Sequence, residues 1–261
     1  MLARFRFIRY AVATLALVLT AGAASAQTLT IAAASDLQTV FPTLARQFQR
    51  ESGHVVTPVF GSSGNFFTQI QNGAPFDLFF SADIDYPRQL EAGKLAEAGS
   101  LYEYAAGQIV LWARKDSGID LSRGLAVLDD ARVRKISIAN PEHAPYGRAA
   151  VAALQHEGLY DRVKAKLVLG ENISQAAQFV QSGAADVGII AFSLTLSGDA
   201  RASGVTHEIP ANAYPPIDQA VVILASSKNK DLARQFLAFL RKPEVVRTLQ
   251  DYGFGLPAAA R

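Results

Sequence analysis

Glycine and serine make up half of the stretch Phe60-Gly61-Ser62-Ser63-Gly64-Asn65-Phe66-Phe67. An apolar run typical of a strand, residues 55–60, leads into it, and the pattern of residues 65–71 predicts a helix after it. The stretch is therefore expected to form a strand-to-helix turn. Unpaired N–H groups and the positive end of the helix dipole meet at a helix N-terminus, so such a turn can hold an anion. Because serine, asparagine and glycine are also ordinary N-cap residues, a capped helix without a ligand remains an alternative.

The same order of strand and helix recurs on both sides of this turn. Upstream, residues 29–34 predict a buried strand, and the apolar positions from Leu37 to Phe48 have helical spacing. Downstream, residues 77–80 predict a strand and residues 86–92 a helix. A second alternating series has strands at 136–139, 167–169 and 187–191 and helices at 146–157 and 173–181. Alternation of this kind predicts parallel sheets with right-handed crossovers.

The two series predict an α/β protein with two Rossmann-like lobes joined by two hinge strands. A long strand at 107–114 separates the series, and a strand at 220–225 with helices at 230–240 and 243–252 ends the chain. We expect lobe I to comprise residues 27–105 and 217–261 and lobe II residues 106–216, with the crossings near 104–107 and 216–219. Ligands of open α/β sheets bind at the carboxyl ends of strands, so both lobes should present their turns to one cleft.

The first 26 residues predict a cleavable secretory signal. Three arginines precede the apolar run 11–21, and the small-residue triplet Ala24-Ser25-Ala26 follows it. The apolar run is too short to span a membrane. Periplasmic export of a soluble chain is therefore expected, with a retained anchor as the lesser alternative.

Charge and cysteine content exclude several classes of protein. The formal charge of the whole chain is +2, and removing three arginines with the signal lowers it to −1. A nearly neutral chain is not expected to bind nucleic acid. The sequence contains no cysteine, which excludes disulfides and thiolate metal sites.

Four strand-to-helix turns could supply ligands to the cleft. They are Ser35-Asp36, Ser62-Ser63-Gly64, Pro145-Tyr146-Gly147 and Asn172-Ile173-Ser174, two in each predicted lobe. Together they offer hydroxyl and N–H donors but no lysine or arginine. A fully deprotonated tetrahedral dianion suits such a site, because each of its oxygens requires donors and none requires an acceptor.

Motifs along the mature chain resemble those of the periplasmic molybdate-binding proteins of ABC transporters. The matching segments are Ala32-Ala33-Ala34-Ser35, Phe60-Gly61-Ser62-Ser63-Gly64, Asn72-Gly73-Ala74-Pro75-Phe76-Asp77-Leu78-Phe79-Phe80-Ser81-Ala82-Asp83, Asn140-Pro141-Glu142-His143-Ala144-Pro145-Tyr146-Gly147 and Tyr252-Gly253-Phe254. Residues 73–83 are the most specific part of the resemblance, which implies a type II periplasmic binding fold. It also implies a monomeric receptor that delivers molybdate, and usually tungstate, to a membrane permease. The ligand positions of the family fall on Ser35, Ser63, Tyr146 and Ile173, with no cofactor and no residue binding a metal cation directly.

Two positions depart from the family pattern. Many members carry a tyrosine ligand in a late strand motif, where this chain has Ala191. The Tyr146 hydroxyl could supply that donor instead. Asp36 places a carboxylate beside the expected anion; residue preference favours an ordinary N-cap that points away, whereas an inward orientation would make phosphate a plausible ligand.

Two alternative functions remain. Within the receptor class, the ligand could be sulfate or phosphate. The protein could also be an exported serine hydrolase, which would need a base beside its serine. Neither Ser35 nor Ser63 lies in a Gly-x-Ser-x-Gly motif. His143 is expected to be a solvated loop residue, and no enzymatic activity is expected.

Overall fold

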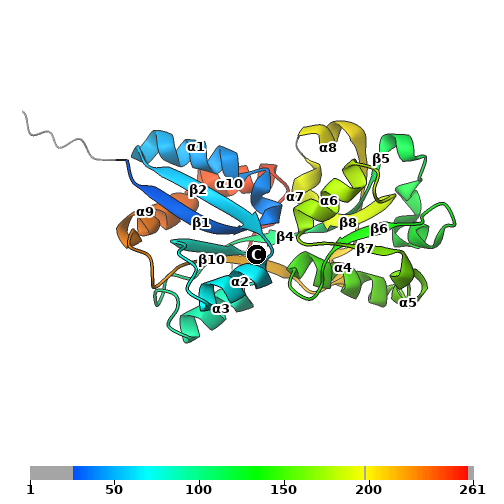
Figure 1. Cartoon of the computed structure of the whole chain (residues 1–261). Coiled ribbons are helices and arrows are strands. Elements are labelled where there is room, and N and C mark those ends of the chain that lie inside the picture. The colour runs from blue at the N-terminus through cyan, green and yellow to red at the C-terminus, as the bar shows by residue number, and fades with distance from the viewer. Residues whose placement is uncertain (1–25, 197, 258–261) are drawn as a thin grey trace, which may run out of the picture.

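The computed structural model describes residues 26–196 and 198–257, which form two five-stranded sheets (Figure 1). The first sheet has the order β2-β1-β3-β10-β4 and the second β7-β6-β8-β5-β9. The strands of the first sheet are β1 (Thr28–Ala34), β2 (Val55–Gly61), β3 (Leu78–Ser81), β4 (Tyr102–Gly107) and β10 (Ile217–Ile223). Those of the second are β5 (Ile109–Arg114), β6 (Ile136–Ala139), β7 (Leu167–Gly170), β8 (Val187–Ala191) and β9 (Gly204–Glu208). The predicted signal lies outside the described residues except for Ala26.

Both sheets combine parallel and antiparallel strands. β1 pairs in parallel with β2 and β3, and β6 with β7 and β8, as the alternating patterns predict. β10 runs antiparallel to β3 and β4, and β5 runs antiparallel to β8 and β9. The strands on either side of the two connections between the sheets, β4, β5, β9 and β10, all pair antiparallel with a neighbour.

Helices cover both faces of the first sheet, and with it form the first lobe. They are η1 (a 3₁₀ helix, Ser35–Gln38), α1 (Phe41–Ser52), α2 (Ser63–Gln71), α3 (Asp85–Ala92), α9 (Lys230–Leu240) and α10 (Pro243–Asp251). Alternate residues of β1 belong to separate cores: Leu29 and Ile31 pack with α1, α9 and α10, while Ala32 packs with α2 and α3. The period-two alternation of a strand thus sorts its side chains between two helical layers.

The second lobe has one large core around its sheet. Its helices are α4 (Pro145–His156), α5 (Tyr160–Val163), α6 (Ile173–Gln181), α7 (Phe192–Thr195) and α8 (Gly198–Ser203), with 3₁₀ helices η2 (Lys115–Ser117), η3 (Leu121–Asp129), η4 (Lys164–Lys166) and η5 (Ala211–Ala213). Trp112 of β5 is fully buried in this core. The chain passes between lobes from β4 to β5 and returns from β9 to β10; the lobe boundaries at 105/106 and 216/217 stay predictions.

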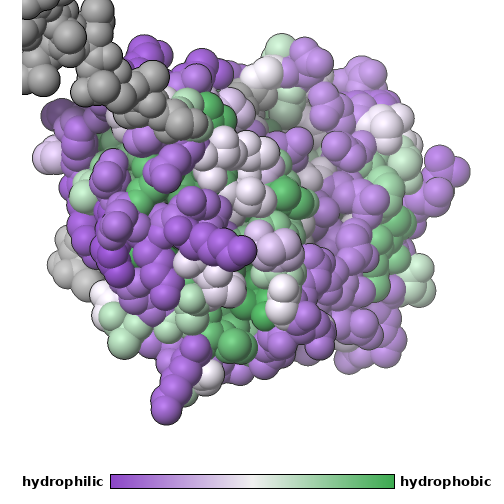
Figure 2. All heavy atoms as spheres, turned by 60° about the vertical axis from the view of Figure 1, so that its left-hand side comes forward, coloured by the Kyte–Doolittle hydropathy of each residue, from purple (hydrophilic) through white to green (hydrophobic). Residues whose placement is uncertain are grey.

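Polar side chains cover most of the face that the first lobe presents in Figure 2, with smaller apolar areas between them. Among the described residues, none of the helices is long and apolar enough to cross a membrane.

Two strands differ from the sequence-based expectation. Residues 102–107 are β4, an integral strand of the first sheet, although only their end was expected to be a strand-like crossing. β9 carries no apolar alternation because it lies at the edge of its sheet with most of its side chains partly or fully exposed. Burial on one face produces the sequence pattern of a strand, and an exposed edge strand lacks it.

Candidate functional site

The four expected ligand residues line one small cavity between the lobes. Its lining consists of Ala34, Ser35, Asp36, Gly61, Ser62, Ser63, Ala82, Ala144, Pro145, Tyr146 and Ile173. The cavity volume is about 10 Å³, close to the space that one water molecule needs. No lysine, arginine or histidine belongs to this lining in the described part of the chain.

Strand register brings the turns of each lobe together. Ala34 at the end of β1 pairs with Gly61 at the end of β2, so the starts of η1 and α2 lie side by side. In the second lobe, Ala139 of β6 pairs with Gly170 of β7, which aligns the loops leading to α4 and α6. The carboxyl ends of the parallel strands meet at one edge, as the alternating pattern predicts.

Gly64 allows the two lobes to approach closely at this edge. Its N–H donates to the His143 carbonyl of the second lobe at 2.9 Å. A Cβ at this position would lie 2.6 Å from the same carbonyl oxygen, which is closer than atoms can approach. A side chain here would force the lobes apart.

Ser63 presents a donor to the cavity. It is fully buried, and its Oγ accepts a hydrogen bond from the Ala82 N–H at 2.9 Å. The amide thus occupies one lone pair and leaves the hydroxyl hydrogen for another acceptor.

Ser35 bridges the lobes. Its hydroxyl donates to Asn172 Oδ1 at 3.2 Å and accepts from the Ser174 N–H at 3.3 Å. Both distances are long for such bonds, so rotating this hydroxyl toward an anion would give up a weak interaction.

The helix starts supply backbone donors. At α6, the Asn172 side chain accepts from Gln175 N–H and caps the helix. Ile173 at α6 and Tyr146 at α4 occupy the first turn, where N–H groups have no acceptor within the helix. These amides are the backbone donors that the second lobe can offer.

Asp36 lies within η1, whose N-cap is Ala34 without a side-chain cap bond, so the expectation that Asp36 is an ordinary N-cap is wrong. The residue lines the cavity. Its side chain is fully buried, and Oδ2 accepts hydrogen bonds from the Tyr146 hydroxyl at 2.9 Å and from Gln219 Nε2 at 2.6 Å. Oδ1 has no hydrogen-bond partner among the described residues. Burial raises the pKa of Asp36 to about 6, against the opposing effect of the bonds from Gln219 and Tyr146. Tertiary contacts with β10 and α4 outweigh the local capping preference.

The Tyr146 hydroxyl is already engaged. It donates to Asp36 and accepts from Gln219 Nε2 at 2.9 Å. Burial, and then the negative charge of Asp36, raise the pKa of Tyr146 well above its usual value. In this arrangement the donor that Tyr146 offers the cavity is its N–H rather than the hydroxyl suggested as a substitute for the missing tyrosine near Ala191.

Gln219 completes this buried network, although it was not among the site residues expected from the sequence. Its Oε1 accepts from the Tyr104 hydroxyl at 2.6 Å, which turns the amide so that Nε2 points to Asp36. The available signal was an amide side chain immediately before the apolar run 220–225. A buried polar residue in a strand requires partners, but the sequence does not name them.

His143 joins the two lobes and is not the solvated loop residue that was expected. Its Nδ1 lies 2.8 Å from Ser62 Oγ, and Nε2 lies 3.8 Å from Glu171 Oε2. The side chain is only 18 % exposed. The three residues form a row that resembles a catalytic arrangement, but the distance to the carboxylate exceeds that of a hydrogen bond.

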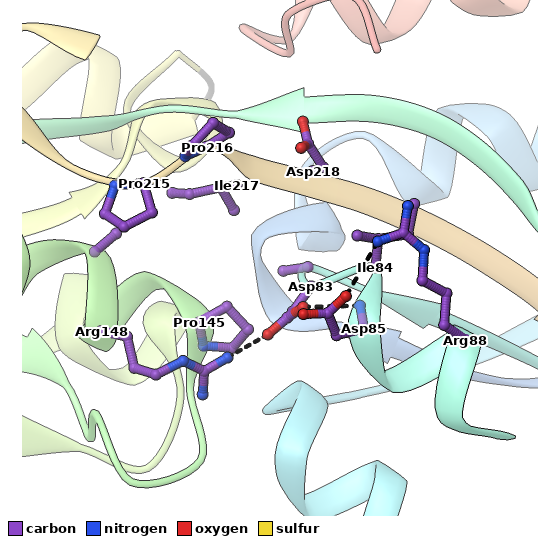
Figure 3. A pocket seen from close by; sticks show the side chains of 12 residues that line it. Asp83, Ile84, Asp85, Arg88, Pro145, Arg148, Pro215, Pro216, Ile217 and Asp218 are labelled. Carbon is purple, nitrogen blue, oxygen red and sulfur yellow. Dashed lines mark hydrogen bonds and ion pairs between the residues drawn. The ribbon is translucent and has the colours of Figure 1, made fainter. Parts of the chain in front are cut away.

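A larger hollow of about 400 Å³ lies beside the cavity (Figure 3). Its charged side chains include Arg148, which donates to Asp83 at 2.5 Å across the lobes, and Arg88, which donates to Asp85 at 3.1 Å. Asp218 also lines it. Its arginines are paired with Asp83 and Asp85, so it suits an oxyanion poorly. The small cavity is the candidate site.

Comparison with known proteins places the chain in a family. The family model for bacterial extracellular solute-binding proteins matches residues 29–255. The molybdate-binding protein ModA of Azotobacter vinelandii is 40% identical over 238 residues, which cover 91% of this chain and 94% of the relative. ModA of Rhodobacter capsulatus is 37% identical over 207 residues, covering 79% and 80%.

A solved structure agrees with this result. The periplasmic molybdate-binding protein of Azotobacter vinelandii matches with a TM-score of 0.83 at 38% identity, covering 88% of this chain and 99% of that protein. This confirms the predicted type II periplasmic binding fold. The chain belongs to the bacterial extracellular solute-binding proteins, and within them to the family of the molybdate-binding ModA proteins.

Proposed function

We propose that this protein is an exported receptor that binds molybdate, and also tungstate, and delivers it to the permease of an ABC transporter. The observation that carries the proposal is that Ser35, Ser63, Tyr146 and Ile173, drawn from both lobes, line a single cavity. The relatives named above are molybdate-binding proteins, which supports the choice of ligand. The protein acts as a monomer, without a cofactor, in the periplasm after removal of residues 1–26.

The donors act as dipoles in place of counter-charges. Serine hydroxyls and amides at helix starts stabilise an anion through oriented partial charges, and burial removes competing water. The cavity has about the volume of one water molecule, which is too small to admit a tetrahedral oxyanion. The lobes therefore separate to let the anion in and then close around it.

Cross-lobe contacts show which groups must separate for entry. They include Thr39 Oγ1 to Ser193 O, Ser193 Oγ to Asp36 O, Asn65 Nδ2 to Glu171 Oε1, and the bonds of Ser35, Ser62, Gly64, Tyr146 and Arg148 described above. Each contact is a hydrogen bond or an ion pair between the lobes. Individually they are weak enough to open and close during ligand exchange.

A thermal-shift series with molybdate, tungstate, sulfate and phosphate tests the proposal. A ligand at a hundred times its dissociation constant adds about 2.7 kcal/mol, which should raise the melting temperature by roughly 5–10 °C for a chain of this size. Molybdate and tungstate should produce this shift, and sulfate and phosphate should not. Equal shifts with sulfate or phosphate would support a receptor for another oxyanion, and no shift with any anion would contradict the receptor function.

The row of Ser62, His143 and Glu171 is the one observation that favours a hydrolase. If it were catalytic, the protein would cleave an activated ester, and Ser62→Ala would abolish the cleavage. We expect no turnover, because Ser62 is buried against a cavity too small for an ester and the carboxylate lies beyond hydrogen-bond distance from the imidazole.

A further inference from the structure

Asp36 is the acidic side chain among the cavity-lining residues, and its orientation is fixed. Tyr146 and Gln219 both hold Oδ2, and the Tyr104 hydroxyl fixes the Gln219 amide from behind. Oδ1 is buried and makes no well-formed hydrogen bond among the described residues, although the backbone N–H groups of Asp36 and Leu37 lie close enough to the carboxyl to lower its pKa. A buried polar atom without a partner is costly, so this oxygen requires an explanation.

The groups that face Asp36 cannot neutralise it. Tyr104 comes from β4 and Tyr146 from α4; the pKa of each is raised, chiefly by burial, so both remain neutral at physiological pH. Two basic side chains of the second lobe that contact the first lobe bond to other groups, His143 to Ser62 and Arg148 to Asp83.

A dianion that entered this cavity beside an ionised Asp36 would meet strong repulsion. Like charges within a few ångströms of each other repel strongly where water is excluded, and the oxyanion carries two charges. The hydroxyl and amide donors would have to overcome this cost. A proton on Oδ1 removes the repulsion and turns the unpaired acceptor into a donor.

We infer that Asp36 takes up one proton when the oxyanion binds, so that the complex contains a neutral carboxyl whose O–H donates from Oδ1 to an oxyanion oxygen. The inference rests on the proposed function. The new O–H bond forms with a proton from the solvent, Oδ2 keeps its bonds from Tyr146 and Gln219, and the oxyanion remains a dianion. Burial already raises the pKa of Asp36 to about 6, which lowers the cost of adding that proton near neutral pH.

Proton uptake can be counted by calorimetric titration of molybdate into the mature protein at about pH 8, in two buffers of different ionisation enthalpy. The wild type should take up close to one proton per molybdate bound. Its affinity should fall by about tenfold per pH unit between about pH 7 and pH 8.5, because the ionised fraction must be protonated.

Asp36→Asn is the informative variant. Its side-chain oxygen can accept from Tyr146 and Gln219, and its Nδ2 replaces the proposed O–H donor. The variant should bind molybdate with no proton uptake and with an affinity nearly independent of pH, about tenfold or more above that of the wild type at pH 8. Asp161→Asn removes an exposed carboxylate of α5, and His143→Gln removes the nearest histidine; both should retain the proton uptake of the wild type.

The outcomes distinguish the receptor function from the role of Asp36. Molybdate binding by the wild type without proton uptake would overturn the role of Asp36 and leave the receptor function standing. Uptake that persists in Asp36→Asn, or disappears in His143→Gln, would also overturn it. If the wild type binds no molybdate in any buffer, the receptor function fails and the role of Asp36 with it. Should Asp36→Asn not fold, the proton count of the wild type and of His143→Gln still decides.

Discussion

Two neighbouring hollows at the junction of the lobes are built from opposite kinds of side chain. The small cavity has a lining of hydroxyls, amide groups and one fully buried carboxylate, whereas the larger hollow in Figure 3 contains arginines paired with aspartates. Charged side chains that form ion pairs with each other attract a further ligand only weakly, and salt screens that attraction. Oriented dipoles in a buried space have no partner that neutralises them, so they remain available for an anion.

The comparison also explains why the carboxylates differ. Asp83 and Asp85 have arginine partners at the hollow, while Asp36 has only neutral donors. Replacing Asp36 should therefore have the largest effect on the folded protein.

Asp36→Asn should stabilise the ligand-free protein at neutral pH. The pKa of Asp36 is raised from 3.8 to about 6, so burying its ionised form costs stability. This cost is complete above about pH 6, shrinks as the pH falls through that value, and is absent below about pH 4. The variant should gain up to roughly 3 kcal/mol in the free energy of unfolding above pH 6 and nothing near pH 4, as measured by urea unfolding. An equal difference between the two proteins at both pH values would show that Asp36 is not a buried titrating group.

Ser63→Ala should weaken molybdate binding by roughly 10- to 100-fold. The variant loses a hydrogen bond to a charged ligand, which contributes about 1.5–3 kcal/mol. It also leaves the Ala82 N–H without its acceptor, so a lower melting temperature is expected. Ser182→Ala, an exposed serine after α6, is the matched control and should bind like the wild type. Unchanged affinity in calorimetry of Ser63→Ala would remove this hydroxyl from the site.

Tyr146→Phe separates the hydroxyl of Tyr146 from its backbone N–H. Removal of the hydroxyl takes one donor from Asp36 and should cost about 1 kcal/mol of stability. Molybdate affinity should change by less than about threefold at pH 6.5, because the N–H at the start of α4 remains. A loss of affinity greater than tenfold would mean that the hydroxyl itself binds the anion, as the absence of a tyrosine near Ala191 first suggested.

Asp83→Asn should have the smallest effect. It breaks the cross-lobe ion pair with Arg148. The side chain of Asp83 is 28% exposed and that of Arg148 is 39% exposed, and such pairs contribute about 0.2–1 kcal/mol to stability. The dissociation rate of molybdate, followed by stopped flow, should rise by less than about fivefold, and the difference should shrink in high salt. A larger effect that persists in salt would place this pair among the groups that hold the anion.

Local pattern predicted much of the fold and of the cavity. The helices at 173–181 and 230–240 have the expected ends because their apolar periodicity ends there. Ser35, Ser63, Tyr146 and Ile173 come together because strand order places their turns at one edge. Asp36 and His143 were misjudged, because their roles depend on Gln219 and Ser62, which are far away in the sequence. A capping preference is local, whereas burial and pairing are decided by the tertiary structure.

The central claim is that uncharged donors from both lobes hold one dianion. Calorimetric titration of molybdate into the wild type and into the double variant Ser35→Ala/Ser63→Ala tests it most directly, with circular dichroism to show that both are folded. The account predicts one molybdate per wild-type chain and a loss of affinity in the folded double variant greater than that of Ser63→Ala alone. Equal binding by the two proteins, or no binding by the wild type, would contradict it.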